Sequence, residues 1–153
     1  MGRDSERVDL MQWHDYFMGM ARAVALKSKD EQTKVGAVIV DKFNRIISTG
    51  YNGPPRLMDD SQIEFVRPMK YPFMIHAELN AILLAHCDLS FCRLYVTGFP
   101  CEHCLLVIQQ TGIVEVVYGN QPINMNTESK LINHVTFGVK EYVDPSTLTE
   151  DDE

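Results

Sequence analysis

Residues 34–49 read KVGAVIVDKFNRIIST, and this stretch decides the fold. Its first part, 34–40, is apolar and β-branched, which is the pattern of a strand buried on both faces. Residues 41–44 (DKFN) are typical of a turn, and 45–49 return as a second β-branched segment. The stretch therefore predicts a β-hairpin whose first strand lies deep inside a sheet.

Helical and strand patterns alternate around this hairpin. Apolar residues recur at three- and four-residue spacing over 13–29, which predicts a helix before the hairpin. Two more helices are expected over 77–85 and 101–111, the second ending at Gly112. The other expected elements are strands over 93–97, 113–118 and 134–139 and a short helix over 126–133. This order predicts an α/β fold, a three-layer α/β/α sandwich with a mixed five-stranded sheet.

The composition is that of one globular domain. The chain has 153 residues, of which 45% are hydrophobic and 23% charged. We expect a single domain over residues 1–145, followed by an acidic, disordered tail over 146–153. The formal net charge of −7, without a basic stripe, argues against binding a nucleic-acid polymer, although a small anionic substrate is compatible with it.

The sequence also bears on the cellular compartment. No apolar run approaches the roughly 20 residues of a membrane span. The first residues are charged and no apolar stretch resembling a signal peptide follows them. We therefore expect a cytoplasmic protein without membrane contact, whose thiols stay reduced.

The chain contains four cysteines, at positions 87, 92, 101 and 104. The Cys101-x-x-Cys104 pair has three interpretations: zinc ligands, a thioredoxin-like redox pair, or coincidence. A zinc ribbon would require a second such pair, which the chain lacks. Cys87 and Cys92 do not have ligand spacing, and we expect them to be small buried residues.

His76 stands at another loop-to-helix junction and completes a set of three zinc donors with Cys101 and Cys104. A catalytic zinc site has three protein ligands and leaves one position for water. Helix N-termini favour anions, which stabilises both thiolates. Glu78 follows in the first turn of the same helix, where it is free to carry protons, although a lone glutamate there is commonly a surface residue that complements the helix dipole.

The combination His76-Ala77-Glu78 with Pro100-Cys101-x-x-Cys104 has the His-x-Glu…Pro-Cys-x-x-Cys pattern of zinc-dependent deaminases. It predicts hydrolytic deamination by one zinc ion per subunit. In this hypothesis a zinc-bound hydroxide attacks C4 of the base, and Glu78 shuttles the protons.

From about Trp13 to about Tyr118 the chain resembles the deoxycytidylate (dCMP) deaminases, a family with the cytidine-deaminase-like fold. The segments that carry the resemblance are 28–30 (SKD), 33–40 (TKVGAVIV), 50–53 (GYNG), 70–72 (KYP), 76–82 (HAELNAI) and 99–104 (FPCEHC). The resemblance implies hydrolysis of dCMP to dUMP, which supplies thymidylate synthesis. It also implies a homohexamer that dCTP, accompanied by Mg²⁺, activates and dTTP inhibits.

The resemblance further implies a substrate site. Asn52 would hydrogen-bond the sugar, Tyr71 and Ala77 would line the base pocket, and Lys29 is the first choice for the phosphate. The full set of candidate phosphate ligands is Lys29, Lys34, Arg56, Arg67 and Lys70. Residues 54–75 contain neither Cys nor His, so the second, structural zinc site of some family members is not expected.

Two alternatives stay open. One is a deaminase of another substrate, cytidine or a tRNA adenosine, although the negative net charge disfavours tRNA. The other is a non-catalytic, zinc-binding regulatory subunit of the same fold, which would not need Glu78.

Overall fold

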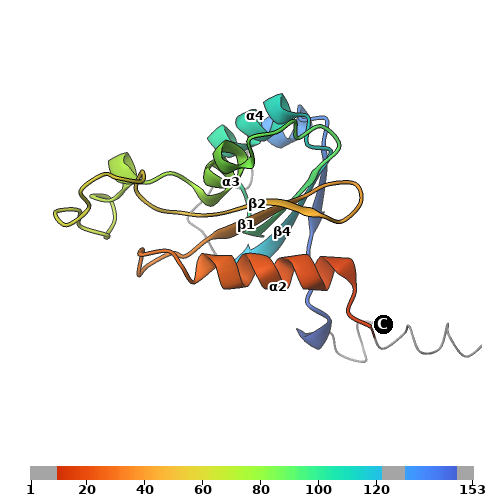
Figure 1. Ribbon diagram of the computed structural model, residues 1–153, viewed down its shortest axis with the longest axis horizontal. Helices are drawn as coiled ribbons and strands as arrows, with labels where there is room; N and C mark the ends of the chain where they lie inside the picture. The colour runs from red at the N-terminus through yellow and green to blue at the C-terminus, as the bar shows by residue number, and fades with distance from the viewer. Residues whose placement is uncertain (1–9, 122–129, 148–153) are drawn as a thin grey trace, which may run out of the picture.

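A computed structural model describes residues 10–121 and 130–147, and it contains a mixed sheet with helices on both faces (Figure 1). The sheet has five strands in the order β2-β1-β3-β4-β5. The strands are β1 (Gly36–Val40), β2 (Ile46–Tyr51), β3 (Arg93–Gly98), β4 (Glu115–Gln121) and β5 (Gly138–Glu141). Strand β1 pairs antiparallel with β2 and β3, whereas β3–β4 and β4–β5 are parallel. The predicted mixed sheet is confirmed.

The helices form the outer layers. They are α2 (Trp13–Ala25), α3 (Ala77–Ala85) and α4 (Glu102–Thr111), with 3₁₀ turns η1 (Tyr71–Phe73), η2 (Lys130–Asn133) and η3 (Pro145–Thr147). Helix α2 covers one face of the sheet, and α3 and α4 cover the other (Figure 1). The three-layer sandwich is therefore confirmed. Among the described helices, none has the length and apolar content needed to cross a bilayer.

The hairpin over residues 34–49 forms as predicted. All five residues of β1 are buried, because helices cover both of its faces. The turn is closed by the Asp41 amide, which donates to the Arg45 carbonyl at 2.9 Å. Asn44 adopts the left-handed backbone conformation that this turn requires, with a φ of 63°.

Two glycines set the distance between the sheet and its helices. A Cβ at Gly36 would lie 1.9 Å from the Ala21 carbonyl oxygen of α2, and one at Gly50 would lie 2.4 Å from the Ala81 nitrogen of α3. Only glycine permits such an approach.

Some predicted boundaries are wrong. The first helix ends at Ala25 instead of Lys29, because the Leu26 and Lys27 amides bond three residues back and tighten the chain into a turn. The last strand begins at Gly138, since the Thr136 amide donates to the Gln109 side chain at 2.8 Å.

The first two residues of the predicted tail, 146 and 147, lie in η3. Ser146 lies in η3, and its amide donates to Asp144 at 2.9 Å. The rest of the predicted tail, 148–153, and the first part of the predicted short helix, 126–129, lie outside the described residues.

Candidate active site

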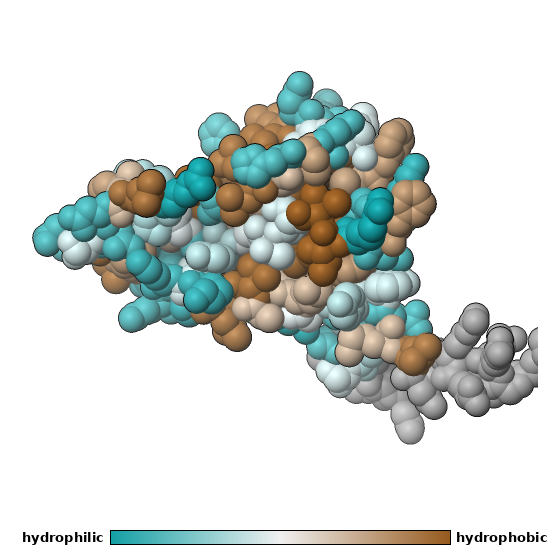
Figure 2. Space-filling model, in the orientation of Figure 1, coloured by the Kyte–Doolittle hydropathy of each residue, from teal (hydrophilic) through white to brown (hydrophobic). Residues whose placement is uncertain are grey.

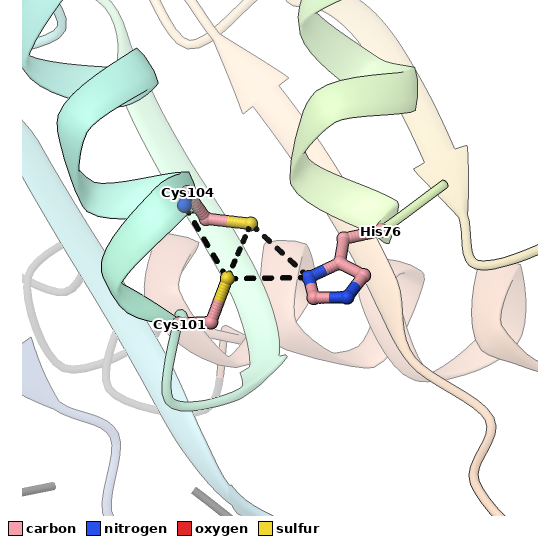
Figure 3. A group of neighbouring side chains, drawn as sticks. All are labelled: His76, Cys101 and Cys104. Atoms are coloured by element: carbon pink, nitrogen blue, oxygen red, sulfur yellow. Dashed lines mark hydrogen bonds between the residues drawn. The ribbon is translucent and has the colours of Figure 1, made fainter. Parts of the chain in front are cut away.

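Two helix N-termini meet on one side of the sheet. His76 is the N-cap of α3 and Cys101 the N-cap of α4, and both residues have extended backbone before their helix begins. The Cys101 sulfur accepts a hydrogen bond from the Cys104 amide at 3.4 Å, as N-cap side chains commonly do. Figure 3 shows the three side chains turned toward one another from these two helices.

The three donor atoms are close enough to hold one metal ion. Cys101 Sγ lies 3.3 Å from His76 Nδ1 and 3.3 Å from Cys104 Sγ, and Cys104 Sγ lies 3.4 Å from His76 Nδ1. A tetrahedral zinc site with ordinary bond lengths separates such donors by about 3.5–3.8 Å. An expansion of a few tenths of an ångström would accommodate the ion, so this donor set fits zinc. Within residues 10–121 and 130–147, this is the single group of three such donors.

Hydrogen bonds within the group shift the pKa values of its three members in different directions. The bond from the Cys104 thiol lowers the pKa of Cys101 to about 4, and the hydrogen bond with His76 acts in the same direction. The same thiol–thiol bond raises the pKa of Cys104, and the bond to Cys101 raises the pKa of His76. The lowered pKa of Cys101 favours its thiolate, which is the form that binds zinc, whereas Cys104 would give up its proton as the ion binds.

Glu78 is buried beside this group. It lies in the first turn of α3 with 4% of its surface exposed, and it lines the same cavity as His76 and Cys101. Burial raises the pKa of the Glu78 carboxyl. A surface glutamate that only complements the helix dipole would be exposed, so the structure argues against that interpretation.

A cavity of about 320 Å³ opens in front of these residues, within the range of small-molecule sites. Three of the four predicted substrate contacts, Asn52, Tyr71 and Ala77, line it. Tyr71 is 53% exposed and Ala77 is fully buried. The cavity thus brings most of the predicted site residues together.

The side chain of Asn52, in the cavity wall, is held by two hydrogen bonds to the backbone of the segment before β1. Its Oδ1 accepts from the Val35 amide at 2.8 Å, and its Nδ2 donates to the Thr33 carbonyl at 2.8 Å. These bonds fix the start of β1 against the end of β2. One N–H of the amide remains to donate to a ligand.

Lys29 is the predicted contact that the structure does not bring to this cavity. Its Nζ lies 2.6 Å from Asp60 Oδ2, and its side chain is 65% exposed. Because α2 ends early, Lys29 lies in the following turn and lines a different cavity, of about 700 Å³, with Tyr51 and Arg56.

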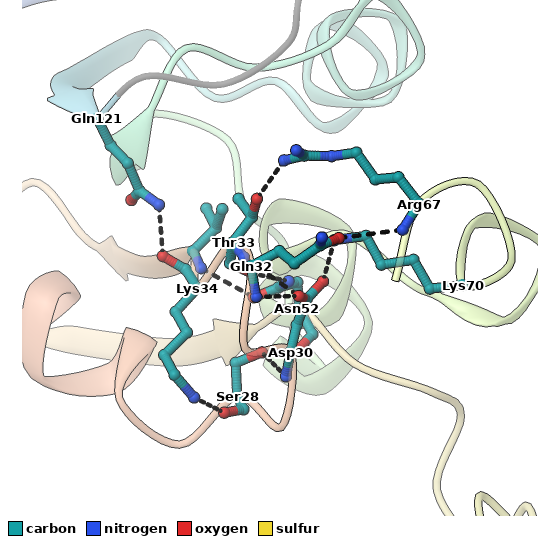
Figure 4. Close-up of polar contacts among 10 residues, drawn as sticks. Ser28, Asp30, Gln32, Thr33, Lys34, Asn52, Arg67, Lys70 and Gln121 are labelled. Carbon is teal, nitrogen blue, oxygen red and sulfur yellow. Dashed lines mark hydrogen bonds and ion pairs between the residues drawn. The ribbon is translucent and has the colours of Figure 1, made fainter. Parts of the chain in front are cut away.

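The sequence did not single out Asp30 and Lys70 as partners. Lys70 Nζ lies 2.6 Å from Asp30 Oδ2, with side chains only 4% and 2% exposed. Asp30 also accepts from the Gln32 and Thr33 amides, so both of its oxygens have partners. Both residues line the cavity, and Figure 4 shows Lys70 reaching across from the long loop. The available signal was that both lie in segments that carry the family resemblance, SKD and KYP.

Comparisons with known proteins agree with this geometry. Residues 11–120 match the family described as the cytidine and deoxycytidylate deaminase zinc-binding region. The deoxycytidylate deaminases of Pongo abelii and Homo sapiens are 42% and 41% identical over 120 residues, covering 74% of this chain and 67% of each relative. A crystal structure of dCMP deaminase from the cyanophage S-TIM5 in complex with dCMP and dUMP superposes with a TM-score of 0.73 at 26% identity, over 87% of this chain and 100% of that one. The matched residues include the three donors and Glu78.

Proposed function

The chain belongs to the cytidine and deoxycytidylate deaminase family, and from this premise we propose that it hydrolyses dCMP to dUMP and ammonia. One observation carries the proposal: a buried carboxyl, Glu78, lies in the same cavity as the His76–Cys101–Cys104 group. The relatives are named deoxycytidylate deaminases, and the solved neighbour holds dCMP and dUMP, which supports this substrate.

His76 Nδ1 and the two cysteine sulfurs would hold the zinc ion. When bound, zinc supplies the Lewis acidity that makes water a nucleophile near neutral pH. The Glu78 carboxylate takes a proton from the attacking water and delivers it to N3 of the cytosine ring. Glu78 then takes the remaining proton of that water, now on the C4 hydroxyl, and passes it to the 4-amino group, which leaves as ammonia while the C4 carbonyl of dUMP forms.

The position of Glu78 suits this proton transfer. Its burial raises the pKa of the carboxyl, which brings the pKa nearer to the working pH of a general acid–base residue. The remaining N–H of Asn52 would donate to the sugar, and Tyr71 at the cavity edge would pack against the nucleotide. We propose these as the contacts that orient the base toward Glu78.

The experiment is a substrate panel. Zinc-loaded protein is supplied with dCMP, CMP, dCTP, deoxycytidine, cytidine, adenosine and a tRNA, and ammonia release is followed. We expect dCMP to have the highest kcat/KM. A preference for cytidine or tRNA would favour the corresponding other deaminase, and zinc binding without any turnover would favour a non-catalytic regulatory subunit.

We further propose a homohexamer regulated by dCTP with Mg²⁺ and by dTTP. Apolar side chains interrupt the hydrophilic surface on the face shown in Figure 2. On α3, Leu83 and Leu84 are 63% and 50% exposed, which supports self-association. Light scattering of the purified protein tests the hexamer, and repeating the panel with each triphosphate tests the regulation.

The proposed setting is the cytoplasm. Cys101 and Cys104 bind zinc only as thiolates, and their sulfurs are 3.3 Å apart. A reducing compartment keeps such a pair from oxidising.

A further inference from the structure

The structure separates the five cations that the sequence offered as phosphate ligands. Lys29 pairs with Asp60, and Lys34 Nζ donates to the Ser28 carbonyl. Neither lines the cavity that contains Glu78, and Arg56 lines the other cavity. Lys70 does line the first cavity, but its charge is balanced by Asp30 within a buried ion pair.

Arg67 is the remaining cation of the cavity lining. Its Nη2 donates to Thr33 Oγ1 at 2.5 Å, and its backbone amide donates to Gln32 Oε1 at 3.0 Å. Figure 4 shows the side chain extending from the long loop to the segment before β1. Among the described residues, no carboxylate lies within ion-pair distance of Arg67. Its guanidinium therefore carries an unbalanced positive charge at the cavity wall.

The hydroxyl of Thr33 adds a second donor at this place. Because Thr33 Oγ1 accepts from Arg67, its own O–H points elsewhere, and no acceptor within the described part of the chain takes it. A guanidinium has five N–H donors, of which the side chain of Thr33 takes one. The pair thus presents several converging donors with a net positive charge, an arrangement that matches a phosphate group.

The rest of the lining places this cation in the same cavity as the chemistry. Thr33 and Arg67 line the cavity together with Asn52, His76 and Glu78. An anion bound at Arg67 would therefore share one cavity with a base presented to Glu78.

We propose that Arg67, oriented by Thr33, binds the 5′-phosphate and makes the site selective for nucleoside monophosphates over nucleosides. This assignment rests on the proposed deaminase function. Lys29, the first choice from sequence, has no part in it, and Lys70 serves to hold the loop.

The test compares two substrates that differ only in the phosphate. The kcat/KM for dCMP is divided by the kcat/KM for deoxycytidine in the wild type and in Arg67→Ala, Arg67→Lys and Thr33→Val. Arg67→Ala should lower this ratio roughly 10- to 150-fold, the range for one hydrogen bond to a charged group. Arg67→Lys keeps the positive charge but loses the planar guanidinium that can donate to two phosphate oxygens at once, so it should give an intermediate ratio. Thr33→Val, which removes the hydroxyl that orients Arg67, should also give an intermediate ratio.

The matched control is Arg56→Ala, an arginine of the same loop that lines the other cavity. Its ratio should equal that of the wild type. If Arg67→Ala lowers the kcat/KM for dCMP and the kcat/KM for deoxycytidine by the same factor, Arg67 only supports the fold and the proposal is overturned. If Arg67→Ala does not fold, as judged by circular dichroism, the ratios of Arg67→Lys and Thr33→Val decide.

A binding measurement separates this proposal from the proposed function. Calorimetric titration with dUMP and with deoxyuridine requires no turnover. If the wild type fails to deaminate dCMP yet binds dUMP more tightly than deoxyuridine, and Arg67→Lys weakens that preference, the phosphate site stands while the deaminase proposal fails. If dUMP has no advantage over deoxyuridine, the phosphate site is wrong.

Discussion

Removing the ammonium of Lys70 should destabilise the protein far more than removing that of Lys29. Both lysines lie 2.6 Å from a carboxylate, Asp30 for Lys70 and Asp60 for Lys29. The pairs differ in burial, because the Lys70 and Asp30 side chains are 4% and 2% exposed, against 65% and 30% for Lys29 and Asp60. Burial should therefore decide the outcome.

Lys70→Met removes one charge and leaves the Asp30 carboxylate buried without its partner. Breaking a buried pair in this way costs about 3–5 kcal/mol. For a chain of this size, each kcal/mol shifts the unfolding midpoint by roughly 2–4 °C, so the midpoint should fall by about 6–20 °C. Lys29→Met should change the midpoint little, because solvent already screens that pair.

The double variant Asp30→Asn/Lys70→Met tests the cause. Asparagine retains an oxygen that can accept from the Gln32 and Thr33 amides, so both charges are removed while these two hydrogen bonds are kept. Most of the lost stability should return, since no unpaired charge stays buried. The assay is thermal unfolding by circular dichroism at fixed protein and zinc concentrations. Equal midpoints for Lys70→Met and Lys29→Met, or no recovery in the double variant, would refute the reasoning.

Two further substitutions test how the cavity is built. Gly50→Ala places a Cβ 2.4 Å from the Ala81 nitrogen and should cost about 1–3 kcal/mol, measured by urea unfolding. The control is Gly19→Ala, a position within α2 where an added Cβ would have nothing within 4 Å. This change should instead stabilise the protein by about 0.5–1 kcal/mol. A loss of stability equal to that of Gly50→Ala would contradict the steric argument. Asn52→Ala deprives the Val35 amide and the Thr33 carbonyl of their partners, so it should cost about 1–3 kcal/mol and lower the kcat/KM for dCMP. Unfolding and kinetics unchanged in this variant would show that these bonds do not hold the cavity wall.

The sequence was most informative where one local pattern is sufficient. Strand β1 could be predicted because burial on both faces requires an uninterrupted apolar run, and residues 36–40 supply it. The cluster of three potential zinc donors could be predicted because His76 and Cys101 are the N-caps of two helices, and Cys104 lies in the first turn of the second. In both cases the decisive residues are close in sequence or fixed by an element boundary.

The sequence was least informative where distant segments select one another. Asp30 and Lys70 are 40 positions apart, and nothing in either segment alone indicates the pairing. In the same way, only contacts between distant segments show that Arg67 lines the cavity while Lys29 pairs with Asp60. Gly50 likewise meets the backbone of α3, a contact that its own segment does not indicate.

The central claim is that Glu78 carries the protons while His76, Cys101 and Cys104 hold the zinc. The most direct test is the rate of ammonia release from dCMP by zinc-loaded Glu78→Gln. This variant retains the three donors and should contain as much zinc as the wild type. Its rate should fall by about 10²- to 10⁴-fold, the contribution of a positioned general acid–base group. A wild-type rate in the zinc-loaded variant would contradict the claim.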